Sequence, residues 1–135
     1  MKTKIKIPDP ARAKAYFEQK VAFTTGPVEV YRALQSRETV VVVDVRAADD
    51  YAKAHVPGAI NVPGDSWRNP EGLRKDAVNI VYCYTQQCHL GAYACVEFAA
   101  QGFPVMEMDG GFEAWQENEL ETESGASRVQ QAFAR

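Results

Sequence analysis

The chain has 135 residues, of which 46% are hydrophobic and 24% charged, with a formal net charge of −3 at pH 7. This length favours one domain with a substantial core, and the composition is that of an ordinary globular protein. The acidic balance, without any block of Lys and Arg, argues against nucleic acid as the main partner. The longest purely aliphatic run, Val40 to Val43, is too short to span a membrane. No apolar stretch follows the N-terminal lysines as in a signal peptide, so we expect a cytoplasmic protein.

In the first half of the chain, hydrophobic spacing and turn residues predict alternating helices and strands. Asp9-Pro10 and Pro27 are typical helix starts. The run from Val40 to Val45 shows no alternation, which indicates a strand buried on both faces. The expected elements are helices over 11–20, 27–35 and 49–54 and strands over 40–45 and 59–62.

The second half continues this alternation. We expect a central strand over 79–82, a helix over 90–101, a strand over 104–108 that alternates and so lies nearer an edge, and a helix over 112–119. A weak apolar stripe in 121–135 suggests an appended or frayed helix. Strands alternating with helices predict an α/β fold, an open parallel sheet of about five strands with helices on both faces.

One short segment holds the clearest chemical signal. The apolar run Asn79 to Tyr82 ends at Cys83, and a helical pattern begins at Leu90. A thiol between a strand end and a helix N-terminus is expected to have a lowered pKa, because the helix dipole and its unpaired N–H groups favour the thiolate. A thiolate is the nucleophilic form of cysteine, so the pattern predicts a nucleophile loop.

All three cysteines, Cys83, Cys88 and Cys95, lie within thirteen residues. A disulfide framework would distribute an even number of cysteines over the chain. The spacing is not that of a zinc knuckle, and Cys95 is two helical turns beyond Cys88. We therefore expect no metal and no cofactor, and we interpret Cys95 as a core residue of the helix.

Several blocks of the sequence resemble the signatures of rhodanese-like domains. They are Asp44 to Arg46, Asp50-Tyr51, His55 to Pro63, the strand from Asn79 to Cys83, Gly102-Phe103, and Asp109 to Trp115. The resemblance covers roughly residues 25–120, in the order of the family's own motifs. It implies a rhodanese-like domain over 25–120, preceded by an N-terminal extension with one helix over 1–24 and followed by a helical tail over 121–135.

The resemblance also implies a function. Rhodanese-like sulfurtransferases move a sulfane sulfur from a donor such as thiosulfate to a thiophilic acceptor, cyanide or a thiol, through a cysteine persulfide. By position, Cys83 would carry the persulfide, and the loop residues Tyr84, Thr85, Gln86, Gln87 and His89 would form the cradle that binds it. The supporting residues Asp44, Arg46 and His55 would hold the scaffold through an ion pair and turn hydrogen bonds.

The loop leaves alternatives open. Cys88 stands where a subgroup of the family has a second Cys, and could be a resolving thiol, the nucleophile itself, or an apolar residue at the loop base. His89 could act as a general base or be a surface residue. With no Lys or Arg in the loop, a persulfide or polysulfide donor is favoured over thiosulfate, and a phosphatase is disfavoured.

The rival from another class is a catalytically weak rhodanese-like module that binds a partner or senses oxidants. The sequence leaves the oligomeric state, monomer or homodimer, undecided.

Overall fold

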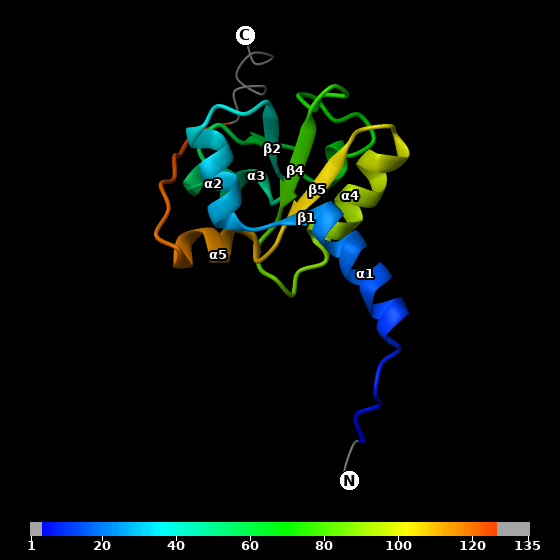
Figure 1. The fold of residues 1–135 in the computed structure, drawn as a ribbon. Helices are drawn as coiled ribbons and strands as arrows, with labels where there is room; N and C mark the ends of the chain where they lie inside the picture. The colour runs from blue at the N-terminus through cyan, green and yellow to red at the C-terminus, as the bar shows by residue number, and fades with distance from the viewer. Residues whose placement is uncertain (1–3, 127–135) are drawn as a thin grey trace.

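The computed structural model describes residues 4–126, which fold into a parallel five-stranded sheet with helices on both faces (Figure 1). The strands are β1 (Thr24–Thr25), β2 (Val40–Asp44), β3 (Ile60–Asn61), β4 (Val78–Tyr82) and β5 (Val105–Met108), arranged in the order β1-β5-β4-β2-β3. The helices are α1 (Pro10–Phe23), α2 (Pro27–Gln35), α3 (Ala48–Lys53), α4 (Leu90–Ala100) and α5 (Gly111–Glu117), with a short 3₁₀ turn at Gly64–Ser66. The predicted fold class is confirmed.

Two hydrophobic clusters fill the two faces of this sheet. On one face, Val42, Ile80 and Met108 pack with residues of α2, α3 and α5, including the fully buried Trp115. On the other face, Val43 and Val81 pack against Ala94 and Phe98 of α4. Because successive strand residues point to opposite faces, the uninterrupted aliphatic run of β2 supplies both clusters.

Four of the five strands coincide with predicted ones, and β4 is central as expected. The edge strand β1 was not predicted. Thr24 and Thr25 carry no hydrophobic pattern, and their strand geometry depends on pairing with Glu107 and Met108 of β5. The predicted strand over 104–108 is second from the edge, which agrees with its expected position nearer an edge.

The segment after α5 differs from the helix expected for 121–135. Residues 121–126 form no helix: Glu123 pairs antiparallel with His55, and Gly125 donates its N–H to the Ala52 carbonyl. The remainder of the expected helix, 127–135, lies outside the described residues. The division into an extension, a domain and a tail remains a prediction.

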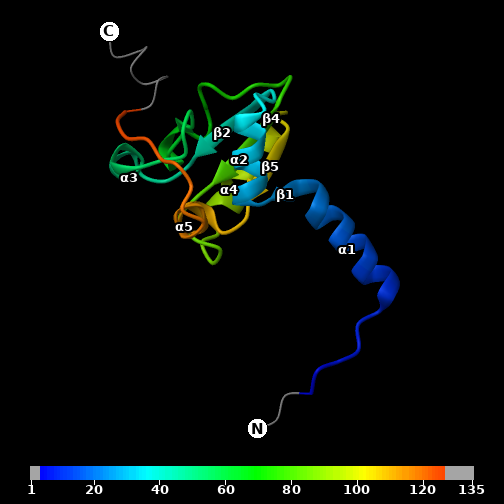
Figure 2. The same cartoon turned by 60° about the vertical axis from the view of Figure 1, so that its left-hand side comes forward.

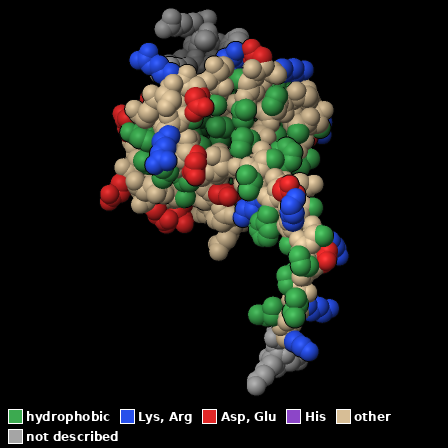
Figure 3. Space-filling view, viewed as in Figure 1, with side chains coloured by type: hydrophobic (Ala, Val, Ile, Leu, Met, Phe, Trp, Pro, Cys, Tyr) green, Lys and Arg blue, Asp and Glu red, His purple; other side chains and the backbone are tan. Residues whose placement is uncertain are grey.

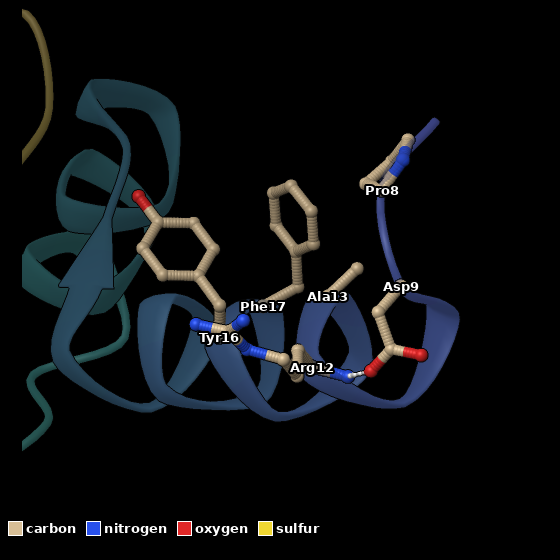
Figure 4. A pocket seen from close by; sticks show the side chains of 6 residues that line it. All are labelled: Pro8, Asp9, Arg12, Ala13, Tyr16 and Phe17. Carbon is tan, nitrogen blue, oxygen red and sulfur yellow. Dashed lines mark hydrogen bonds between the residues drawn. The ribbon is translucent and has the colours of Figure 1, made fainter. Parts of the chain in front are cut away.

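Helix α1 projects from the body of the molecule and leads the chain to its edge strand (Figures 1 and 2). Its first turn is capped by Asp9, whose carboxylate accepts a hydrogen bond from the Arg12 N–H at 3.0 Å (Figure 4). An aspartate N-cap followed by Pro10 at N1 is a strong helix start. The cap rather than tertiary packing therefore defines where this helix begins.

Candidate active site

Cys83 follows the last residue of the central strand β4, at the edge where parallel strands present their carboxyl ends. Ligands bind at this edge in open α/β sheets. The loop from Tyr84 to His89 then leads directly into α4. The fold therefore places the cysteine loop where the sequence predicted it.

The loop is held by neighbouring elements on two sides. The Tyr84 hydroxyl donates to Asp50 of α3 at 2.6 Å and accepts from the Ala47 N–H. At the first turn of α5, the Phe112 N–H donates to the Cys83 carbonyl at 2.8 Å and the Glu113 N–H to the Tyr84 carbonyl at 3.0 Å. These bonds fix the backbone on both sides of the Cys83 thiol.

The Cys83 thiol is only 3% exposed, and its environment contradicts the expected lowering of its pKa. Burial and, after it, the neighbouring Cys88 thiol raise the pKa of Cys83 to about 11, although hydrogen bonds from the Gly91 and Tyr84 N–H groups act in the opposite direction. The helix N-terminus does reach this sulfur, as the sequence implied. Its N–H groups lower the pKa of Cys83 by less than burial beneath α4 raises it.

Cys88 is partly exposed and has the lowered pKa that was expected of Cys83. Burial raises the pKa of Cys88, but hydrogen bonds from the Leu90 N–H, the Cys83 thiol and the Tyr84 N–H outweigh it. Of the two thiols, Cys88 therefore loses its proton first. Three backbone N–H groups, those of Tyr84, Leu90 and Gly91, face the pair of sulfurs and form an anion-binding cradle.

Glu107 of β5 is a site residue that the sequence did not indicate. In the parallel ladder it is in register with Val81, so its side chain points to the α4 face. A Cβ built on Gly91 would lie 2.6 Å from the Glu107 carboxylate and 3.4 Å from Cys83 Sγ. Burial and Asp109 raise the pKa of Glu107, while His89 lowers it. Only the alternation of strand 104–108 could have placed this residue, and alternation does not say which helix covers it.

Each of the three supporting residues is buried and held by polar contacts. Arg46 makes a buried ion pair with Asp44 at 2.8 Å and stacks over the Phe112 ring at 4.2 Å. Asp44 also accepts a hydrogen bond from Tyr82 at 2.6 Å. His55 Nδ1 lies 2.7 Å from the Tyr51 carbonyl, and its Nε2 lies 3.5 Å from Glu123. These contacts support a scaffolding role for all three.

The remaining loop residues take different positions. Gln86 accepts a hydrogen bond from the Gly110 N–H, and Thr85 accepts one from the Cys88 N–H through its carbonyl. Gln87 and His89 are exposed. Within residues 4–126, His89 makes no hydrogen bond to either thiol, and its ring faces Tyr93 at 6.5 Å. Its position agrees with the surface interpretation more than with a general base.

The described part of the chain offers neither a metal site nor a membrane-spanning helix. No set of three His, Cys, Asp or Glu side chains in residues 4–126 is grouped to hold a metal ion. No helix in the same range has the length and hydropathy needed to cross a bilayer.

Comparison with known proteins gives consistent matches. Residues 27–118 match the family model described as rhodanese-like domain. The chain is 36% identical over 108 residues to the thiosulfate sulfurtransferase GlpE of Pseudomonas putida strain GB-1, covering 78% of this chain and 96% of that relative. A crystal structure from Bacillus halodurans superposes with a TM-score of 0.79 at 28% identity, covering 94% of this chain and all of the other. The thiosulfate sulfurtransferase of Pseudomonas aeruginosa superposes with a TM-score of 0.64 at 32% identity, over 77% of this chain and 20% of that one.

Proposed function

Because this chain belongs to the rhodanese-like domain family, we propose that it is a sulfurtransferase that carries a sulfane sulfur as a persulfide on Cys83, with Cys88 as proton acceptor and resolving thiol. The observation that carries the proposal is the pair of thiols facing three backbone N–H groups at the carboxyl end of the central strand. The names of the Pseudomonas relatives support the same class of reaction.

The two thiols have different roles in the first step, the loading of sulfur onto Cys83. The Cys88 thiol has the lower pKa of the two and ionises first, whereas Cys83 keeps its proton to higher pH. As the Cys83 sulfur attacks the outer sulfur of the donor, its proton moves to Cys88, the donor's S–S bond breaks, and sulfite or a thiolate leaves. Once deprotonated, a thiol of higher pKa is the stronger nucleophile, which favours Cys83 as the attacking sulfur. The N–H cradle then stabilises the persulfide anion.

Two routes release the sulfur. An acceptor thiolate or cyanide attacks the outer sulfur of the persulfide and restores the Cys83 thiolate. Without an acceptor, the Cys88 thiol gives its proton to the outer sulfur of the persulfide and attacks Cys83 Sγ, so that a disulfide forms and hydrosulfide leaves. All three cysteines are free thiols in the structure, which is the reduced state from which the loading step starts.

Charge around the cradle bears on the choice of donor. Residues 84–91 contain no Lys or Arg, and the Glu107 carboxyl lies beneath Gly91. Thiosulfate is a dianion that would approach without a charge-assisted partner. We therefore expect a persulfide or polysulfide to load Cys83 faster than thiosulfate does.

Intact-protein mass spectrometry tests the proposal. Wild type treated with glutathione persulfide or thiosulfate should gain about 32 Da for each sulfur bound, and dithiothreitol should remove it. The adduct should be absent from Cys83→Ser and retained in Cys95→Ser, the matched control in the second turn of α4. Wild type left without an acceptor should then lose about 2 Da relative to the reduced protein, and Cys88→Ser should not.

Other outcomes would overturn parts of this assignment. An adduct that depends on Cys88 alone would make Cys88 the carrier. If neither donor leaves an adduct or a loss of about 2 Da on folded wild type, nor an adduct on Cys88→Ser, the sulfurtransferase assignment is wrong, and the chain is a binding or redox-sensing module of the same fold.

A further inference from the structure

Helix α1 presents apolar side chains that the described part of the chain does not cover. None of its fourteen residues is buried, and Tyr16, Phe17, Val21 and Phe23 are 60%, 56%, 75% and 61% exposed. Tyr16 and Phe17 contact each other edge to face beside Ala13 (Figure 4). An apolar surface of this extent on a globular protein marks an interaction site.

A matching apolar groove lies where α1 meets the domain. It has a volume of about 350 Å³ and is lined by Phe23, by Val105 and Met106 of β5, and by Cys95, Val96 and Ala99 of α4. On the outer side of α4, Tyr93 and Val96 are 66% and 68% exposed. Figure 3 shows hydrophobic side chains both along α1 and over the neighbouring surface of the domain.

The geometry of the chain prevents α1 from filling its own groove. Phe23, the last residue of α1, is followed directly by Thr24, which already pairs with Glu107 in the sheet. No loop residue lies between the helix and the strand, whereas helix connections that reverse direction use at least two. Helix α1 therefore does not fill the groove of its own chain, which leaves the groove open to the α1 helix of a second copy.

Charge identifies the kind of chain that fits. Residues 1–23 contain six Lys or Arg and two Asp or Glu, which gives a net charge of +4. Residues 24–135 contain nine Lys or Arg and sixteen Asp or Glu, which gives a net charge of −7. Glu107 lines the groove and makes no ion pair with any residue of the described range 4–126. The groove thus suits an apolar helix that carries basic residues, and α1 carries Arg12, Lys14 and Lys20.

We propose that α1 of one copy of this chain packs into the groove between α4 and β5 of a second copy, forming a homodimer in which the two arms are exchanged. The same helix and the same groove occur on each copy, so one two-fold axis satisfies both contacts at once. The basic segment 1–23 of each copy, called the arm below, then lies against the acidic remainder of the other copy, residues 24–135.

Sedimentation velocity and light scattering on the full chain test this arrangement. Wild type should have twice the chain mass of 15.0 kDa. Val21→Glu on α1 and Val96→Glu in the groove should each shift the protein to the monomer mass with an unchanged circular dichroism spectrum. Val28→Glu, which changes an exposed valine of α2 outside the groove, is the matched control and should remain dimeric.

Cross-linking identifies which surfaces meet. With a photoreactive phenylalanine at position 17 and an equimolar mixture of ¹⁴N and ¹⁵N protein, mixed-isotope cross-links should join the α1 peptide to residues 92–100. Cross-links of one isotope only, or a monomeric wild type, would overturn the proposal. A monomer that cosediments with anionic lipid vesicles would also overturn it and assign α1 to a membrane surface.

Discussion

At the scale of residues, the central feature of the site is a pair of thiols with opposite pKa shifts. The pKa of Cys83 is raised to about 11, mainly by burial and then by the neighbouring Cys88 thiol. The pKa of Cys88 is lowered by backbone N–H groups and by the Cys83 thiol. Each thiol is thus one cause of the shift of the other. The pair titrates as a unit, with the first proton lost mainly from Cys88.

This coupling predicts how each thiol responds when its partner is removed. The rate of alkylation by iodoacetamide, followed against pH by mass spectrometry, reports the thiolate at each cysteine. In wild type, Cys88 should react with a midpoint below that of an ordinary thiol, and Cys83 with a midpoint near 11. In Cys88→Ala the midpoint of Cys83 should fall, and in Cys83→Ala the midpoint of Cys88 should rise.

A purely structural role for Cys88 would leave the Cys83 midpoint unchanged in Cys88→Ala. Cys95→Ser is the control, because Cys95 is a cause of neither shift; its own pKa is raised to about 12 by burial, by Glu107 and by Cys83.

The residues of the site could be predicted only in part. A strand ending in Cys83, with Cys88 before the next helix, was sufficient to locate the loop and to leave the roles of the two thiols open. The sequence could not show how deeply α4 buries Cys83, so the direction of its pKa shift was wrong. Glu107 was missed because its side chain enters the site from a neighbouring strand, twenty-four positions along the chain from Cys83.

At the scale of elements, the first turn of helix α5 packs against the backbone of the cysteine loop. Gly111 begins this helix with a φ of +61°, and a Cβ there would lie within 2.7 to 2.8 Å of the backbone of Cys83, Tyr84 and Thr85. The two N–H donors that fix the loop follow immediately. The absence of a side chain at this position is what allows α5 to approach the loop so closely.

Gly111→Ala should therefore affect both stability and chemistry. The left-handed conformation and the backbone clash together should cost about 1–3 kcal/mol or more in the free energy of unfolding, measured with urea. Persulfide loading should slow as well, since α5 has to move away from Cys83. Gly64→Ala, at a glycine with no atom within 4 Å of an added Cβ, should change neither quantity measurably. Equal effects of the two substitutions would contradict this account.

Prediction of the elements succeeded where a local pattern exists. The aliphatic runs of β2 and β4 and the Gly and Pro boundaries of the helices are visible in the sequence itself. The two residues of β1 become a strand only through their partners in β5. Segment 121–126 is held in place through tertiary hydrogen bonds such as those to His55 and Ala52. Tertiary hydrogen bonds of this kind leave no periodicity to detect.

At the scale of the whole molecule, charge is distributed unevenly along the chain: residues 1–23 carry a net charge of +4 and residues 24–135 a net charge of −7. If the arms of two copies are exchanged, stability is linked to protein concentration by mass action. A tenfold rise in concentration should raise the midpoint of thermal unfolding of wild type by about 3 °C, measured by differential scanning fluorimetry. The same rise should leave Val96→Glu unchanged, and 0.5 M NaCl should reduce the shift in wild type because the arm and domain attract electrostatically. A concentration-independent midpoint in wild type would contradict the exchange.

The pairing of β1 with β5 has a consequence for how the protein is made. The strand that follows α1 is near the start of the chain, yet its partner is synthesised about eighty residues later, a delay of about 4–16 s at ribosomal speeds. During that interval the sheet edge that anchors α1 does not exist. Each arm thus leaves the ribosome long before its own domain can hold it in place, and assembly between copies becomes a step that follows translation.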